Sequence, residues 1–265
     1  MNWLVNTLTS TLGRKLVTAL TGLFMMLFLV VHLIGNIQLL KADGGESFNK
    51  YAQFMGHNPI IQTVSIANFG FILLHIVMTV LLTLQNKKAR PISYAHDGMG
   101  KSSAWSSRNM GILGTVVLIF IVVHLQNFWY AMKFNVGLPP AVTYPGDLTA
   151  YKDLYTLTKV AFEELWLVIL YVISMIFLGL HLSHGFESVF QTLGLYHLKY
   201  NVLVKKIGMA LCVLVPAGYA VIPIVSHFKL DYGFPILGGV LAVGLVLSVV
   251  YQPRNLTKVM VAGDA

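Results

Sequence analysis

Four histidines set inside apolar stretches are the residues of this sequence best suited to chemistry. They are His32, His75, His124 and His181, and the first lies in FLVVHLIGNIQLL at residues 28–40. Burying an imidazole among Leu, Val and Ile costs free energy unless a partner satisfies its nitrogens. A hydrogen bond between two membrane helices would explain any one of them. One in each of four consecutive apolar runs points instead to a shared set of metal ligands.

The number and the neutrality of these imidazoles favour haem over other metal sites. Zinc and copper prefer three or four ligands at one level. Proton relays usually include carboxylates, and no Asp or Glu lies deep in the four runs. Haem iron takes two axial ligands from opposite sides, and a porphyrin is apolar enough to fill a bundle core. Two b-type haems with two histidines each would carry electrons and leave no open iron position for oxygen.

Membrane-spanning helices must position these histidines. Hydrophobic residues make up 56% of the 265 residues and charged residues 11%, where a soluble domain carries roughly 25% charged residues. A spanning helix needs roughly 20 apolar residues. The sequence therefore predicts an all-α polytopic transmembrane bundle forming one integral-membrane domain over 1–265. Its candidate spans are 16–40, 63–84, 110–131, 163–186 and 203–226, with a weaker sixth run at 234–251.

The distribution of charge indicates topology. The formal net charge is +8, but alternating the loops across a membrane gathers most Lys and Arg residues on the side of the N-terminus. This positive-inside pattern predicts a cytoplasmic N-terminus in a bacterial inner membrane, with lipid rather than nucleic acid as the partner of the basic residues. The single cysteine, Cys212, excludes a disulfide scaffold and a thiolate metal centre in this chain.

The histidines fall at two depths when the runs cross the membrane alternately. A rise of 1.5 Å per residue places His32 and His124 roughly 24–25 Å from the basic residues at the inner face. It places His75 and His181 roughly 18 and 9 Å from that face. The sequence therefore predicts an outer pair, His32 with His124, and an inner pair, His75 with His181.

Neighbouring residues supply a rival ligand and candidate haem contacts. His184 lies one turn from His181 and competes with it as the ligand of that helix. Gly35 and Gly185 each share a helical face with a histidine, which would leave room for a macrocycle. Haem propionates need basic or hydroxyl partners near an interface, and the candidates for the inner haem are Thr18, Ser106, Ser107 and Arg108.

Four segments carry a resemblance to a known family over about the first 200 residues. They are GRKLVTALTGLFMMLFLVVHLIGN, LHIVMTVLLTLQNKKARPISY, SSRNMGILGTVVLIFIVVHLQNFW and LHLSHGFESVFQTLGL. The sequence resembles the dihaem cytochrome b membrane-anchor subunits of succinate:quinone oxidoreductase (succinate dehydrogenase, respiratory complex II) and of quinol:fumarate reductase. The resemblance implies that the first helix pairs with the third and the second with the fourth, and it favours His181 over His184.

The resemblance also implies partners and a role. A flavoprotein subunit with FAD and an iron–sulfur subunit would lie on the cytoplasmic side and carry out the dicarboxylate chemistry of the tricarboxylic acid cycle. This chain would pass electrons between the clusters and a membrane quinone, menaquinone in most dihaem relatives. Two features depart from the family. The run at 234–251 adds a candidate sixth helix, and Gly179 stands where some fumarate reductases carry a buried glutamate.

A quinone site is expected near the outer haem, in GGESFNKYAQFMGHNP. Its polar candidates are Glu46, Asn49, Tyr51 and His57, with Glu46 or His57 as proton acceptor. Two other functions remain open. One is the cytochrome b subunit of another membrane oxidoreductase, such as a hydrogenase or formate dehydrogenase. The other is a haem-free transporter, which the lack of buried acids and of paired broken helices disfavours.

Overall fold

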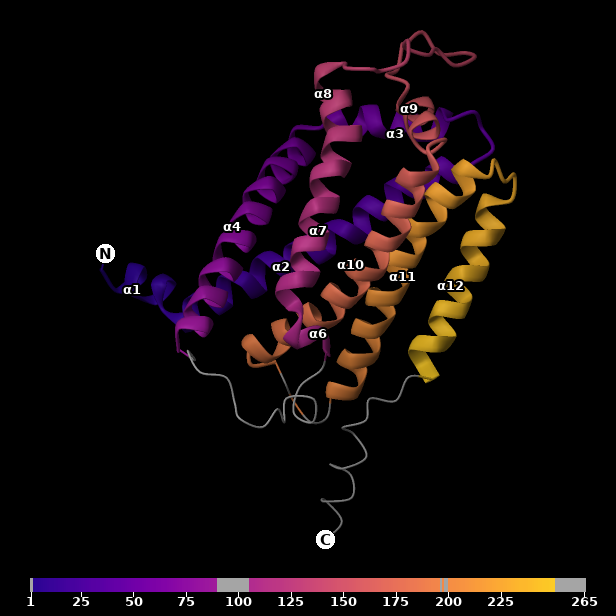
Figure 1. The fold of residues 1–265 in the computed structure, drawn as a ribbon. Coiled ribbons are helices and arrows are strands. Elements are labelled where there is room, and N and C mark those ends of the chain that lie inside the picture. The colour runs from indigo at the N-terminus through magenta and orange to yellow at the C-terminus, as the bar shows by residue number, and fades with distance from the viewer. Residues whose placement is uncertain (1, 90–104, 196, 198–199, 251–265) are drawn as a thin grey trace.

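The computed structural model describes residues 2–89, 105–195, 197 and 200–250, and this part of the chain is a bundle of helices (Figure 1). The long helices are α2 (Thr11–Asn36), α4 (Pro59–Ala89), α7 (Met110–His124), α10 (Leu165–Thr192), α11 (Asn201–His227) and α12 (Gly233–Val250). A π-helical segment (Leu125–Tyr130) and α8 (Ala131–Phe134) continue α7. Shorter elements are α1 (Asn2–Thr9), a 3-10 turn (Ile37–Leu40), α3 (Glu46–His57), α6 (Trp105–Arg108) and α9 (Leu154–Ala161).

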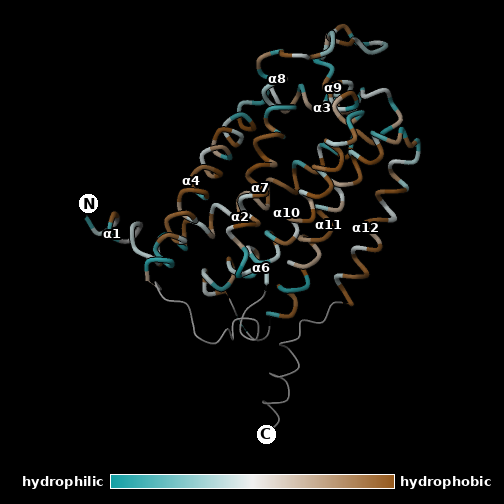
Figure 2. Tube along the Cα trace, in the orientation of Figure 1, coloured by the Kyte–Doolittle hydropathy of each residue, from teal (hydrophilic) through white to brown (hydrophobic). Residues whose placement is uncertain are grey.

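Six helices within the described residues are long and apolar enough to cross a membrane. Thr11–Leu40 and Met110–Phe134 each count as one of these spans, because the segments that follow α2 and α7 continue them. Figure 2 shows hydrophobic residues along the helices and hydrophilic residues gathered towards their ends. The prediction of an all-α polytopic membrane bundle is confirmed, and the weak run at 234–251 is the sixth helix, α12.

Two helix pairs stand on either side of a gap, and a third group closes one flank. α2 packs along α4, and α10 packs along α7. α10 also contacts α2 and packs against α11, which carries α12 on its other side. Gly179 belongs to the α10–α11 contact, because a Cβ there would lie 3.0 Å from the Cys212 carbonyl oxygen. Gly179 therefore lies at a close contact between α10 and α11.

Local sequence signals fix where the long helices begin. The Asn58 side chain accepts hydrogen bonds from the backbone N–H groups of Ile60 and Ile61, at 3.0 and 3.3 Å. Pro59 follows at the first position of α4, where its missing N–H costs nothing. Ser10 caps α2 in the same way by accepting from the Gly13 N–H at 3.0 Å. These caps turn the chain sharply between α3 and α4 and between α1 and α2.

A polar cap closes one end of the bundle, which we call the cap end. It consists of α3, the loop 135–153 and α9. The stretch 132–162 is predicted as an irregular loop ending in an interfacial helix, and α9 is that helix. The stretch 41–62 is predicted as a connection, but it contains the twelve-residue helix α3. Hydrogen bonds from the Tyr151 hydroxyl and the Thr149 backbone lower the pKa of Asp147 in this cap to about 2.

Charge separates the two ends of the bundle. The opposite end, which we call the basic end, carries many more cations than acids among the described residues. It holds Arg14, Lys15, Lys87, Lys88, Arg108, Lys205 and Lys206 with Glu187 as an acid. Lys residues at the cap end are balanced by Asp43, Glu46, Asp147, Asp153, Glu163, Glu164 and Asp231. Arg90, Lys101, Lys199, Arg254 and Lys258 lie outside the described residues.

Asn49→Ala is expected to destabilise the cap. Asn49 is 1% exposed, and its amide donates to the Tyr144 hydroxyl and to Asp153 at 2.8 and 3.0 Å. Its carbonyl accepts from the Tyr155 backbone N–H at 3.0 Å. Truncation leaves these buried groups unpaired, at a cost of about 2 kcal/mol. Thermal unfolding in detergent, followed by circular dichroism, would measure it.

The matched control is Thr63→Ala. The Thr63 hydroxyl is exposed and bonds only to its own helix, at the Pro59 carbonyl. Its loss is expected to change the free energy of unfolding by less than about 0.5 kcal/mol. Equal unfolding temperatures for the two variants would contradict the structural role of Asn49.

Candidate bis-histidine sites

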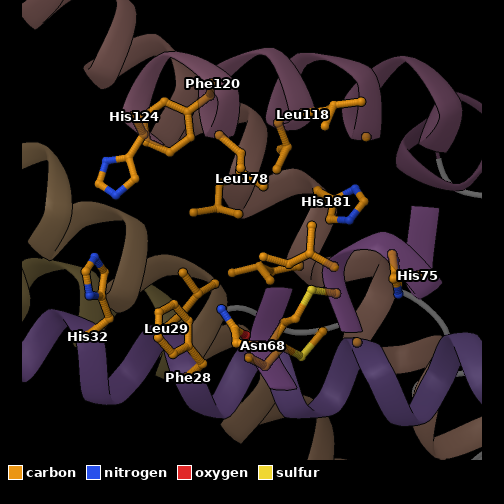
Figure 3. Close-up of a pocket in the computed structure, with 18 of the residues that line it drawn as sticks. Phe28, Leu29, His32, Asn68, His75, Leu118, Phe120, His124, Leu178 and His181 are labelled. Atoms are coloured by element: carbon orange, nitrogen blue, oxygen red, sulfur yellow. The ribbon is translucent and has the colours of Figure 1, made fainter. Parts of the chain in front are cut away.

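A cavity of about 2120 Å³ runs between the α2–α4 pair and the α7–α10 pair, and all four histidines of the apolar runs line it. Figure 3 shows His32 facing His124 at one part of the cavity and His75 facing His181 at another, with Asn68, Phe28 and Leu178 between them. A site for one small ligand usually measures about 300–1,000 Å³. The cavity therefore has room for more than one large cofactor.

The histidines meet in two pairs, as the depth argument predicts. The ring centroids of His32 and His124 are 5.9 Å apart, and those of His75 and His181 are 6.5 Å apart. Two imidazoles that bind one metal from opposite sides, each with its nitrogen about 2 Å from the metal, have centroids about 6 Å apart. Among the described residues no group of three or more His, Cys, Asp or Glu side chains could hold a metal ion. Each pair thus offers two imidazoles, the number of ligands that the predicted bis-histidine haem requires.

The two pairs are separated by about 15 Å along the helices. A Cβ on Gly22 of α2 would lie 3.4 Å from the His75 ring, so Gly22 marks the level of the second pair on the helix of His32. A Cβ on Gly114 of α7 would lie 3.5 Å from the His181 ring. Each glycine precedes the outer histidine of its helix by ten residues, a rise of about 15 Å. Two independent helices give the same spacing.

A repeated sequence pattern, which the predictions from the apolar runs do not include, underlies this spacing. GLFMMLFLVVH at 22–32 and GTVVLIFIVVH at 114–124 both place Gly ten residues and Phe four residues before the histidine. Phe28 stacks on His32 with centroids 5.2 Å apart, and Phe120 stacks on His124 at 5.7 Å. Gly22 and Gly114 are the glycines whose Cβ positions lie next to the rings of His75 and His181.

The Nδ1 nitrogen of His75 has protein partners, which leaves Nε2 as the nitrogen that could bind a metal. His75 Nδ1 lies 3.2 Å from the Thr18 carbonyl oxygen and 3.1 Å from Thr21 Oγ1. A carbonyl only accepts hydrogen bonds, so Nδ1 carries the hydrogen and Nε2 keeps its lone pair for coordination. His181 Nδ1, by contrast, is buried without a hydrogen-bond partner among the described residues.

The other predicted haem contacts divide between the cavity and its surroundings. Thr18, Arg108, Gly35, Gly185 and His184 line the cavity, whereas Ser106 and Ser107 do not. Tyr51 fills the room that Gly35 leaves, because a Cβ there would lie 2.5 Å from the Tyr51 ring. Met26 lies 3.2 Å from the corresponding position at Gly185. These residues remain predictions as cofactor contacts.

Of the four quinone candidates, only Tyr51 lines the cavity. Asn49 is fully engaged in the cap, and Glu46 forms a half-exposed ion pair with Lys50 at 2.7 Å. His57 is exposed, and its Nδ1 lies 2.8 Å from the Gln53 carbonyl oxygen of its own helix. Tyr51 is therefore the candidate that can reach a molecule inside the bundle.

The cavity is also lined by polar residues that were not among the candidates predicted from the sequence. Lys15 and Lys87 join Arg108 at the basic end, so cations from α2, α4 and the start of the third span converge there. Asn68 lines the middle of the cavity, is 6% exposed, and has no partner for its carbonyl oxygen among the described residues. No sequence pattern predicts either the group of cations at the basic end or the position of Asn68 in the cavity.

Comparison with known proteins adds no relative. No family model, no curated protein and no solved structure matches this chain. The geometry of the two histidine pairs therefore carries the functional argument.

Gly22→Ile is expected to break the pair His75–His181 and, with it, the binding of one of the two predicted haems. The Cβ alone would lie 3.4 Å from the His75 ring, so a branched side chain must displace that ring and break the pair with His181. A pyridine haemochrome assay would measure the haem content of the purified chain. We expect about two haems per chain in the unmodified protein, one for each bis-histidine site, and about one in the variant.

Gly70→Ile is the control, because nothing lies within 4 Å of the corresponding Cβ on the exposed face of α4. It is expected to keep the haem content of the unmodified chain. A Gly22→Ile protein with an unchanged haem content would show that the ring of His75 does not need its observed place.

Proposed function

We propose that this chain is the membrane-anchoring, haem- and quinone-binding subunit of a succinate:quinone oxidoreductase. It would pass electrons between an iron–sulfur partner subunit and membrane menaquinone. The observation that carries the proposal is the meeting of four histidines from four helices in two pairs, at two levels of one cavity. A chain of two electron carriers across a membrane needs this arrangement.

The residues of the chain would hold, orient and insulate the cofactors. Two b-type haems would supply one-electron oxidation and reduction at each level, with both axial positions taken by histidine. Stacked Phe28 and Phe120 support the rings of His32 and His124. Apolar side chains such as Leu29, Leu118 and Leu178 line the space between the levels and would keep water away from both irons.

The basic end would hold carboxylates and face the cytoplasm. Lys15, Lys87 and Arg108 line the cavity there, and the pair His75–His181 is the nearer of the two pairs to this end. Cations at a membrane interface bind haem propionates by charge-assisted hydrogen bonds. An excess of Lys and Arg also marks the cytoplasmic side of a bacterial inner membrane. The flavoprotein subunit with FAD and the iron–sulfur subunit would therefore dock at the basic end.

The cap end would hold the quinone. Tyr51 and Gln62 line the cavity there and offer hydrogen bonds to a carbonyl. Glu46 and His57 lie on the same helix as Tyr51, at the polar surface of the cap, and either would accept a proton released on quinol oxidation. The pair His32–His124 is the nearer of the two pairs to this end.

Haem content and partner identity test the proposal together. The chain, purified with its associated proteins from its own membrane, is expected to show a b-type difference spectrum with two haems per chain and succinate-reducible haem. Flavoprotein and iron–sulfur subunits that copurify with the chain would support the proposed partners. A spectrum without b-type haem would overturn it. Haem with hydrogenase or formate dehydrogenase partners would retain the haem sites but replace the enzyme.

His32→Ala and His75→Ala are expected to remove different haems. Each variant should retain about one haem per chain, because each site loses one of two axial ligands. The remaining haem should differ in midpoint potential between the two variants. His57→Ala is the control, since its exposed ring lies in the cap. Loss of the same spectral component in both variants would contradict the pairing.

Lys87→Gln is expected to weaken retention of the haem held by His75 and His181 while leaving the other haem in place. Both side chains are exposed, but Lys87 lines the cavity and the neighbouring Lys88 does not. Loss of one charge-assisted hydrogen bond costs about 2 kcal/mol, roughly a 30-fold weaker binding. Haem loss to an excess of apomyoglobin would measure it. Equal loss rates in Lys87→Gln and Lys88→Gln would contradict the carboxylate-binding role.

A further inference from the structure

Tyr171 of α10 lies against the ligand ring of His124 on α7. Its hydroxyl oxygen is 3.3 Å from His124 Nδ1, and the side chain is 7% exposed. The phenol ring is held edge-on by Phe120, Phe128 and Phe162, with centroids 5.0, 6.1 and 5.1 Å away. This packing fixes where the hydroxyl lies, so its contact with the imidazole follows from the core of the bundle.

Coordination would settle the direction of this hydrogen bond. A neutral imidazole that offers one nitrogen to a metal carries its hydrogen on the other. With Nε2 toward the cavity, Nδ1–H donates and the Tyr171 oxygen accepts. The phenol proton then needs its own acceptor. Asn127, in the segment that follows His124, is a neighbouring polar side chain that interacts with this hydroxyl.

The backbone beside His124 is arranged for this contact. The π-helical segment Leu125–Tyr130 begins directly after His124 and contains Asn127. One wide turn in an otherwise α-helical span changes which side chains face a neighbouring helix, and such turns are frequent at functional sites. The Nδ1 of His124 lies beside the hydroxyl of Tyr171. The Nδ1 of His75 instead donates to a backbone carbonyl, and the Nδ1 of His181 has no partner among the described residues.

We propose that Tyr171 is a positioning residue for the haem of the pair His32–His124. It holds His124 with Nε2 toward the iron and sets the reduction potential of that haem, without touching the haem itself. This rests on the proposed function. An acceptor at Nδ1–H makes the imidazole a stronger donor to the metal. Stronger donation favours the ferric state, so the Tyr171 hydroxyl lowers the potential of this haem relative to a site without it.

Tyr171→Phe tests the proposal by removing the hydroxyl while keeping the ring that packs against three phenylalanines. Tyr219→Phe is the matched control. Tyr219 lies 6.0 Å from the His32 ring by centroids, but its hydroxyl donates to the Leu29 carbonyl at 2.7 Å and not to an imidazole. Both variants of the full chain are titrated potentiometrically, and their ferric low-spin signals are recorded by electron paramagnetic resonance.

The expected result is an upward shift of one midpoint potential and a changed signal of the same haem in Tyr171→Phe. The other haem should keep its wild-type potential and signal, which also shows that the variant folds. Tyr219→Phe should leave both haems unchanged. A shift confined to the haem that survives in His75→Ala would assign the effect to the pair His32–His124.

Two outcomes would overturn the proposal in distinguishable ways. Wild-type protein without two low-spin haems removes the proposed function and this inference with it. Two wild-type haems whose potentials and signals are the same in Tyr171→Phe leave the proposed function standing and remove the role of Tyr171. Equal shifts in Tyr171→Phe and Tyr219→Phe would also remove it, because the effect would then come from the loss of any nearby hydroxyl.

Discussion

The distance between the α2–α4 pair and the α7–α10 pair determines both the contacts between the histidines and the size of the cavity. Both histidine pairs reach across the gap between them, at centroid separations of 5.9 and 6.5 Å. Protein interiors are normally packed to the density of organic crystals, so a cavity of about 2120 Å³ between helices is a large departure. The cofactors of the proposed function would restore the missing contacts, and the histidines would attach them to all four helices.

The rest of the fold holds this gap open from one side. The buried core lies mostly along α10 and α11 and their contacts, including Tyr171, Met175, Val221 and Ile222. α4 and α7 present few buried residues, Asn68 and Leu113 among them. One wall of the cavity is therefore fixed by protein packing. The other wall depends on α2, on the cap at α3 and α9, and on what occupies the space.

The sequence was sufficient for the spans and for the pairing, because both follow from properties that act locally. Twenty apolar residues form a membrane helix wherever they occur, and a rise of 1.5 Å per residue converts residue number into depth. Helix α3 was missed because its residues are mostly polar and lie between two spans. The role of Asn49 was missed because its partners are Tyr144, Asp153 and Tyr155, about a hundred residues away. Side chains at that separation are brought together only by the tertiary fold.

The Phe spacing shared by α2 and α7, without the glycine, also occurs in the second helix of each pair. Phe71 precedes His75 by four residues, and Phe177 precedes His181 by four. The four helices that carry these histidines thus form two hairpins with the same Phe spacing, and each histidine pair takes one ring from each hairpin. Neither half contains a complete site. Under the proposed function, cofactor binding is consequently a property of the joined halves alone.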